Sequence, residues 1–140
     1  MASHIKLIIN KTPQPQSRPR FTARGRYVHA YENKKITMYK RMVAATYQSY
    51  FGAVKPTEKA IAVDVVFYRP VQKSISKIER QRRLTGESLP AIKPDIDNYV
   101  KAILDALNGV AFRDDKQIIS LNAKKLYSDK PRTEIEIKEI

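Results

Sequence analysis

The order of hydrophobic periodicities limits this chain to a mixed α/β architecture. Apolar and polar residues alternate, as in half-buried strands, over residues 4–10, 27–30, 60–68, 117–127 and 133–140. Apolar spacings of three and four, typical of amphipathic helices, occur over residues 33–51, 74–83 and 97–107. This order predicts one α/β (α+β) domain over residues 1–140, with a mixed sheet packed against helices.

Proline and glycine predict the form of two connections. Residues 11–26 carry three prolines and Gly25 among basic side chains, which predicts an extended basic loop. Asp129-Lys130-Pro131 suits a tight turn, so we expect residues 117–127 and 133–140 to form a hairpin.

The charge balance favours a polyanionic partner. The 140 residues include 27 Lys and Arg but only 14 Asp and Glu, a net charge of +13. Cysteine is absent and there are two histidines, which excludes disulfides, Cys-ligated metals and a His-built metal centre. The sequence shows no membrane-spanning run and no signal peptide, so we expect a cytoplasmic protein. It also shows no phosphate-cradling glycine loop, and we expect no organic cofactor.

One window reverses the sign of the charge. Residues 95–115 contain five aspartates against Lys101 and Arg113, whereas residues 1–59 contain twelve Lys or Arg and two acids. Clustered carboxylates repel one another unless protons, cations or solvent relieve them. A bound divalent metal would relieve this repulsion.

The first acidic element opens a predicted helix. Pro94 disfavours helix at the preceding residue, so the helix is expected to begin just after it, with Asp95 or Asp97 as its cap. Asp97 and Lys101, four residues apart, then lie on one face. Asn108-Gly109 ends the helix, and its expected buried stripe consists of Ile96, Val100, Ile103, Leu104 and Leu107.

The second acidic element follows the helix after a short connection. Asp114 and Asp115 stand just before a predicted strand, and the loop must fold back for either to reach Asp95 and Asp97. Three or four aspartates could hold one or two Mg²⁺ ions, because Mg²⁺ prefers oxygen ligands. Lys101 beside them could neutralise charge that develops on a phosphoryl group.

Together these segments resemble the RusA Holliday-junction resolvases. The resemblance lies in Lys93–Gly109, with its Asp-x-Asp-Asn-x-x-Lys pattern, in Asp114-Asp115-Lys116-Gln117, and in Arg18–Val28, which looks like the opening of phage and prophage members. It implies a RusA-like fold and a homodimer that uses Mg²⁺ or Mn²⁺ to nick four-way DNA junctions symmetrically in recombination and repair. Lys93 stands where many members have Arg, and Tyr99 where Leu is commoner.

The resemblance also implies roles for individual residues. Asp95, Asp97 and Asp115 match the metal-binding and catalytic acids, with Asp114 beside them as a further candidate ligand, and Lys101 matches the catalytic lysine. Basic side chains are expected to hold the DNA arms by their phosphates; the candidates are Arg18, Arg20, Arg24, Arg26, Lys73, Lys77, Arg80, Arg82, Arg83 and Lys93.

Two other functions fit the same residues. One is a non-catalytic nucleic-acid-binding module in which the acidic cluster is incidental. The other is a metal-dependent nuclease that acts on flaps or on ordinary duplex DNA. Cleavage of a four-way junction, a fork and a linear duplex would separate these possibilities.

Overall fold

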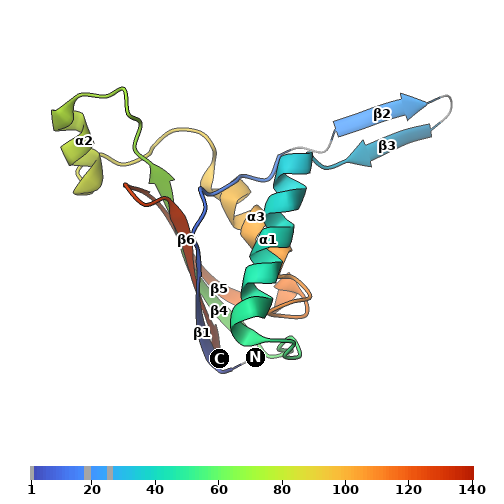
Figure 1. Ribbon diagram of the computed structural model, residues 1–140. Helices are drawn as coiled ribbons and strands as arrows, with labels where there is room; N and C mark the ends of the chain where they lie inside the picture. Colours follow the sequence, from blue (N-terminus) through green and yellow to red (C-terminus); the bar gives the residue numbers. More distant parts are fainter. Residues whose placement is uncertain (1, 18–19, 25–26) are drawn as a thin grey trace.

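The computed structural model describes residues 2–17, 20–24 and 27–140, with the backbone alone over 20–24 and 27–30. These residues form a single α+β domain (Figure 1). In chain order its elements are β1 (His4–Ile9), β2 (Arg20–Arg24), β3 (Tyr27–Tyr31), α1 (Lys34–Phe51), β4 (Ile61–Pro70), α2 (Lys77–Leu84), α3 (Ile96–Leu107), the 3₁₀ turn η1 (Asp115–Gln117), β5 (Ile118–Ser128) and β6 (Arg132–Glu139).

A mixed four-stranded sheet forms the centre of the domain. Its strand order is β1-β6-β4-β5, and β4 pairs parallel with β5 and antiparallel with β6. Helices α1 and α3 cover one face of this sheet (Figure 1). Strands β2 and β3 form a separate antiparallel hairpin that projects from the body of the domain.

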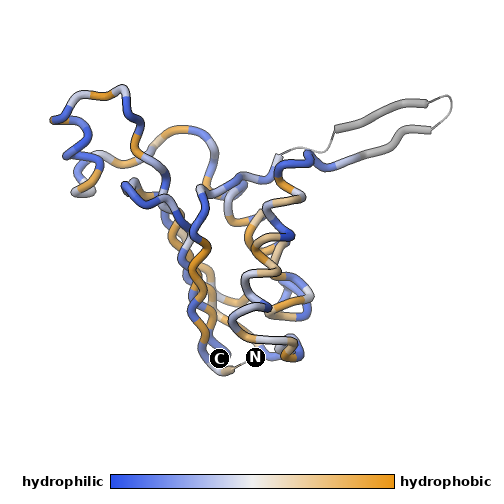
Figure 2. The backbone as a smooth tube through the Cα atoms, viewed as in Figure 1, coloured by the Kyte–Doolittle hydropathy of each residue, from blue (hydrophilic) through white to orange (hydrophobic). Residues whose placement is uncertain are grey.

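The core lies between the sheet and helices α1 and α3. Alternate residues of a strand point to opposite faces of the sheet, and Figure 2 shows hydrophobic residues recurring along the strands of the sheet and along α1. The buried side chains include Ile61, Val63, Val65 and Phe67 of β4 and Ile135 and Ile137 of β6. Tyr99 of α3 is buried and stacks on Phe67 with ring centroids 5.1 Å apart, so tyrosine packs in the core at this position.

The structure corrects two expectations about connections. Strands β5 and β6 do not form a hairpin, because β4 lies between them and pairs with both. Residues 129–131 do turn the chain, but a turn motif in the sequence does not determine which strand will pair with β5 or with β6. The segment 11–26 is not loop throughout, since Arg20–Arg24 forms β2 and pairs with β3.

The buried face of α3 differs from the predicted stripe. Ile103 and Leu107 are buried as expected, together with Tyr99, Ala102 and Ala106. Three residues predicted at the centre of the stripe, namely Ile96, Val100 and Leu104, are only partly buried. The sheet covers only part of the apolar surface of α3. The uncovered part is the ridge of residues 96, 100 and 104, which lines a groove beside β5.

Helix α2 lies apart from this core and buries none of its residues. Its first turn is capped by Ser76, whose hydroxyl accepts a hydrogen bond from the Glu79 backbone N–H at 3.1 Å. Arg83 pairs with Glu79 at 3.1 Å and lies over the ring of Tyr127, which attaches α2 to β5. Within the described parts of the chain, no helix has the length and apolarity needed to cross a membrane.

Candidate active site

A groove of about 440 Å³ runs between α3 and β5 and contains the chemistry-bearing residues. Its apolar lining comes from the partly buried ridge of α3 and from Leu121 and Ala123 of β5. Its charged lining is Asp97, Lys101, Asp105 and Asp115. The fold therefore brings three of the predicted site residues, Asp97, Lys101 and Asp115, to one depression although they come from two separate elements.

The beginning of α3 leaves both of its aspartates accessible. Asp95 occupies the N-cap position, but its side chain makes no capping hydrogen bond. Asp97 is also exposed, and its Oδ1 accepts a hydrogen bond from the Asn98 backbone N–H at 3.0 Å. The approach to the helix is held by Lys125, whose Nζ donates to the carbonyls of Ile92 and Pro94 at 2.8 and 2.9 Å.

Gln117 holds the turn that carries Asp114 and Asp115. Its Nε2 donates to the carbonyls of Thr57 and Lys59, each at 2.8 Å, and its Oε1 accepts from the Asp114 backbone N–H at 2.8 Å. The Asp114 carboxylate accepts from the Lys116 backbone N–H at 3.0 Å. It also accepts from the Gln117 backbone N–H, and this bond forms a capping box with the bond from the Asp114 backbone to the Gln117 side chain. The sequence pattern included Gln117, but its contacts with Thr57 and Lys59 join residues 60 and 58 positions apart and could not be read from that pattern.

The two neighbouring aspartates have unequal acidity. The pKa of Asp115 is raised, first by its hydrogen bond with Asp114 and then by burial and by the negative charges of Asp114 and Asp105. The positive charge of Lys101 acts in the opposite direction and lowers this pKa. The pKa of Asp114 is lowered, first by the hydrogen bond from the Lys116 backbone. Asp115 thus lies among like charges, a surrounding in which a cation would be stabilised.

The donors suit a hard cation held by few protein ligands. Among the described residues, no three acids converge closely enough to hold a metal ion on their own. Asp97 lies two helical turns before Asp105 on α3, and Asp115 is placed near Asp105 and Lys101. Mg²⁺ is usually bound through one or two carboxylates with waters and substrate phosphates, and Asp97 and Asp115 supply such oxygens. Asp95 and Asp114 lie outside the groove lining.

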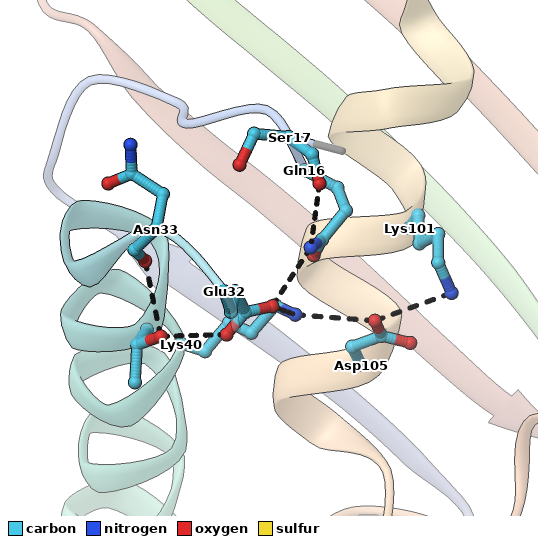
Figure 3. A network of polar contacts seen from close by, with 8 residues as sticks. Gln16, Ser17, Glu32, Asn33, Lys40, Lys101 and Asp105 are labelled. Carbon is cyan, nitrogen blue, oxygen red and sulfur yellow. Dashed lines mark hydrogen bonds and ion pairs between the residues drawn. The ribbon is translucent and has the colours of Figure 1, made fainter. Parts of the chain in front are cut away.

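Lys101 lies beside Asp97 and Asp115 with most of its side chain exposed. Its side chain is 62% exposed, and its Nζ lies 3.5 Å from Oδ2 of Asp105, four residues further along α3. This is the ion pair that the spacing in the sequence allows. Figure 3 shows that Asp105 is also contacted by Lys40 of α1, a partner that the sequence did not indicate.

The candidate DNA-binding residues that the structure describes lie on the β2–β3 hairpin and in or near α2. Arg20 and Arg24 are on β2 of the projecting hairpin, where only the backbone is described, and Arg18 and Arg26 lie outside the described residues. Lys73 and Lys93 flank α2 and are exposed, as are Lys77 and Arg82 on the helix itself. Arg80 is partly exposed, whereas Arg83 is engaged with Glu79 and Tyr127 and is the least available to a phosphate.

Comparison with known proteins decides the family. The profile of the family described as Endodeoxyribonuclease RusA matches residues 10–138. The chain belongs to the RusA family. One relative, the "Uncharacterized protein YqaN" of Bacillus subtilis (strain 168), is 36% identical over 138 residues, 97% of this chain and 96% of the relative. The "Crossover junction endodeoxyribonuclease rusA" of Lactococcus phage r1t is 43% identical over 49 residues, 34% of this chain and 37% of that protein.

Proposed function

We propose that this protein is a Mg²⁺-dependent endonuclease that resolves four-way DNA junctions by paired, symmetric nicks in recombination and repair. The observation that carries the proposal is the convergence of Asp97, Lys101 and Asp115 on one groove of a RusA-family chain with a net charge of +13. Mn²⁺ would be expected to substitute for Mg²⁺. We expect the protein to act in the cytoplasm.

Asp97, Asp115 and Lys101 have distinct parts in the proposed phosphodiester hydrolysis. Asp97 and Asp115, with Asp95 and Asp114 close by in sequence, would supply carboxylate oxygens to the ion. When bound, Mg²⁺ would supply an activated water and would stabilise the leaving oxygen. Lys101, from the same helix as Asp97, directs its ammonium group toward the phosphoryl oxygens and neutralises the charge that develops there.

The basic projections hold the DNA around this groove. The hairpin and the α2 region carry the candidate arginines and lysines on opposite sides of the domain (Figure 1). Contacts of this kind go to phosphates and recognise the shape and path of the strands rather than the bases. The protein therefore binds junction arms without needing a base-specific element.

A homodimer is the expected working form. Symmetric nicks need two identical sites related by a two-fold axis, which a C₂ dimer supplies. Sedimentation equilibrium or light scattering measures this directly: the 16.1 kDa chain should show twice its mass, and a strictly monomeric protein that still makes paired nicks would contradict the expectation.

The decisive experiment compares three labelled DNA substrates of the same sequence. A four-way junction, a fork and a linear duplex are incubated with the protein in Mg²⁺, in Mn²⁺ and with a chelator. Resolution of the junction by symmetric nicks, abolished by the chelator, is the expected result. Equal rates on all three substrates would indicate a general nuclease, and junction binding without cleavage in either metal would indicate a non-catalytic binding module.

Matched variants link cleavage to the groove. Asp97→Asn and Asp115→Asn should lose cleavage but keep or strengthen junction binding, because repulsion from the phosphates decreases. Asp64→Asn is the control, since Asp64 is exposed on β4 and points away from the face that carries Val63 and Val65. Wild-type cleavage by both groove variants would exclude this site.

A further inference from the structure

Lys40 lies between two acids that belong to different parts of the fold. It stands on α1 with its side chain only 16% exposed, and its Nζ contacts Oε1 of Glu32 at 2.5 Å and Oδ2 of Asp105 at 3.3 Å. Oδ2 of Asp105 is also the atom that pairs with Lys101 at 3.5 Å (Figure 3). One carboxylate oxygen is therefore shared by an ammonium group from α1 and another from α3.

The sharing affects how firmly Asp105 holds Lys101. Two cations at one carboxylate repel each other, so each weakens the attachment of the other. Lys40 is largely enclosed, whereas the Lys101 side chain is 62% exposed and borders the groove. Lys101 is thus the partner that can leave Asp105 at little cost.

We propose that Lys40 is a positioning residue for Lys101: by occupying Asp105 from the α1 side, it loosens Lys101 so that its ammonium can reach a phosphate in the groove. This rests on the proposed function, in which Lys101 acts on the phosphoryl group. Without Lys40, the partly buried Asp105 carboxylate would have Lys101 as its remaining cationic partner in the network of Figure 3 and would hold it more tightly.

Glu32 acts on the same network in the opposite direction. The hydrogen bond from Lys40 is the first cause that lowers the pKa of Glu32 to about 2, so Glu32 is charged at neutral pH and draws Lys40 away from Asp105. Glu32 directly follows β3 and also accepts hydrogen bonds from Gln16 and Thr37, each at 2.8 Å. Removing its charge should let Lys40 bind Asp105 more closely and release Lys101 further.

The two variants are therefore expected to change cleavage with opposite signs. Single-turnover cleavage of a four-way junction is measured in Mg²⁺ with enzyme in excess, so that weaker DNA binding does not affect the rate. Lys40→Met should slow cleavage roughly threefold to fivefold, the range that an ion pair of this exposure allows, while the Kd for the junction stays unchanged. Lys40→Arg should cut at the wild-type rate, and Glu32→Gln should cut at that rate or faster.

Removing the shared acid supplies the rescue test. The double variant Lys40→Met/Asp105→Asn should recover the wild-type rate, because no carboxylate then holds Lys101 back. If Lys40 merely supported the fold, the losses from Lys40→Met, Glu32→Gln and Asp105→Asn would add instead. Equal losses in Lys40→Met and Glu32→Gln, or absence of rescue, would overturn the proposal.

A measurement without DNA separates this proposal from the proposed function. A double-mutant cycle with Lys101→Met and Asp105→Asn, read by urea unfolding, gives the coupling between these two residues. The coupling should be clearly larger with Met at position 40 than with Lys, and an unchanged coupling would refute the sharing. A wild-type protein that cuts no DNA would refute the proposed function, while this cycle would still decide the role of Lys40.

Discussion

Replacing Gln117 with alanine tests how the second acidic element is held. The Gln117 side chain makes three hydrogen bonds of 2.8 Å, to the Thr57 and Lys59 carbonyls and from the Asp114 backbone N–H. A neutral hydrogen bond contributes about 1 kcal/mol net. Water can replace part of these contacts because the side chain is only partly buried, and the Thr57 carbonyl keeps its bond from the Arg113 backbone N–H at 3.1 Å.

We therefore expect Gln117→Ala to lower the free energy of unfolding by about 2 kcal/mol. Equilibrium unfolding in urea measures this as a shift of the midpoint at constant slope. Because the turn that carries Asp115 loses its attachment, cleavage should also require a higher Mg²⁺ concentration than in the wild type. Gln48→Ala, at an exposed position on α1, is the matched control and should change stability by less than about 0.5 kcal/mol.

The substitution Gln117→Glu, which changes the charge but hardly the shape, tests whether the two donated hydrogen bonds hold this turn. Gln117→Glu keeps an acceptor for the Asp114 N–H but would direct a carboxylate oxygen at the carbonyls of Thr57 and Lys59. It should destabilise the protein at least as much as alanine, although its shape is nearly unchanged. Wild-type stability in Gln117→Glu would show that the two donated hydrogen bonds do not hold the turn.

Two further predictions concern acid stability and the core. Glu32→Gln should remove stability that the wild type has above pH 4.5 and loses as the pH falls toward 2, because its folded-state pKa is depressed to about 2. The Glu32 side chain is about one-third exposed, so solvent weakens this effect. The free energy of unfolding of the two proteins should therefore differ by about 1–2 kcal/mol at neutral pH. Parallel acid unfolding curves for the two proteins would contradict this prediction. Phe67→Ala should lower the free energy of unfolding by about 3–5 kcal/mol, because Phe67 is buried and stacks on Tyr99. Tyr68→Ala, on the opposite face of β4, should lower it clearly less. Equal losses of stability would mean that the core is not where the structure places it.

The sequence predicts well what depends on neighbouring residues. Helix α3 was expected within one residue of its observed start because Pro94 and the apolar spacing act locally. Lys101 and Asp105 are four residues apart on this helix, a local spacing that allows the ion pair seen in the structure. The sequence required the connection after α3 to fold back, and in the structure Asp115 lines one groove with Asp97 and Lys101 of that helix.

Contacts between distant segments could not be predicted in this way. The turn at residues 129–131 was recognised, but its chemistry says nothing about β4, which arrives from far upstream and separates β5 from β6. Lys40 and Asp105 are 65 residues apart and each looks like a solvated charge in isolation. Only the packing of α1 beside α3 shows that they share one network.

The central position of β4 has a consequence for how the chain folds. Every pair within the four-stranded sheet joins residues far apart in sequence, and the shortest separation is that of Ile61 and Ile118. The sheet therefore has no local hairpin from which to grow, and closing long loops precedes any gain from strand pairing. In contrast, the β2–β3 hairpin joins neighbouring residues and can form within microseconds. We expect the β2–β3 hairpin to acquire its local pairing long before the groove between α3 and β5 exists. The pairing of β4 should then control the rate at which the domain folds.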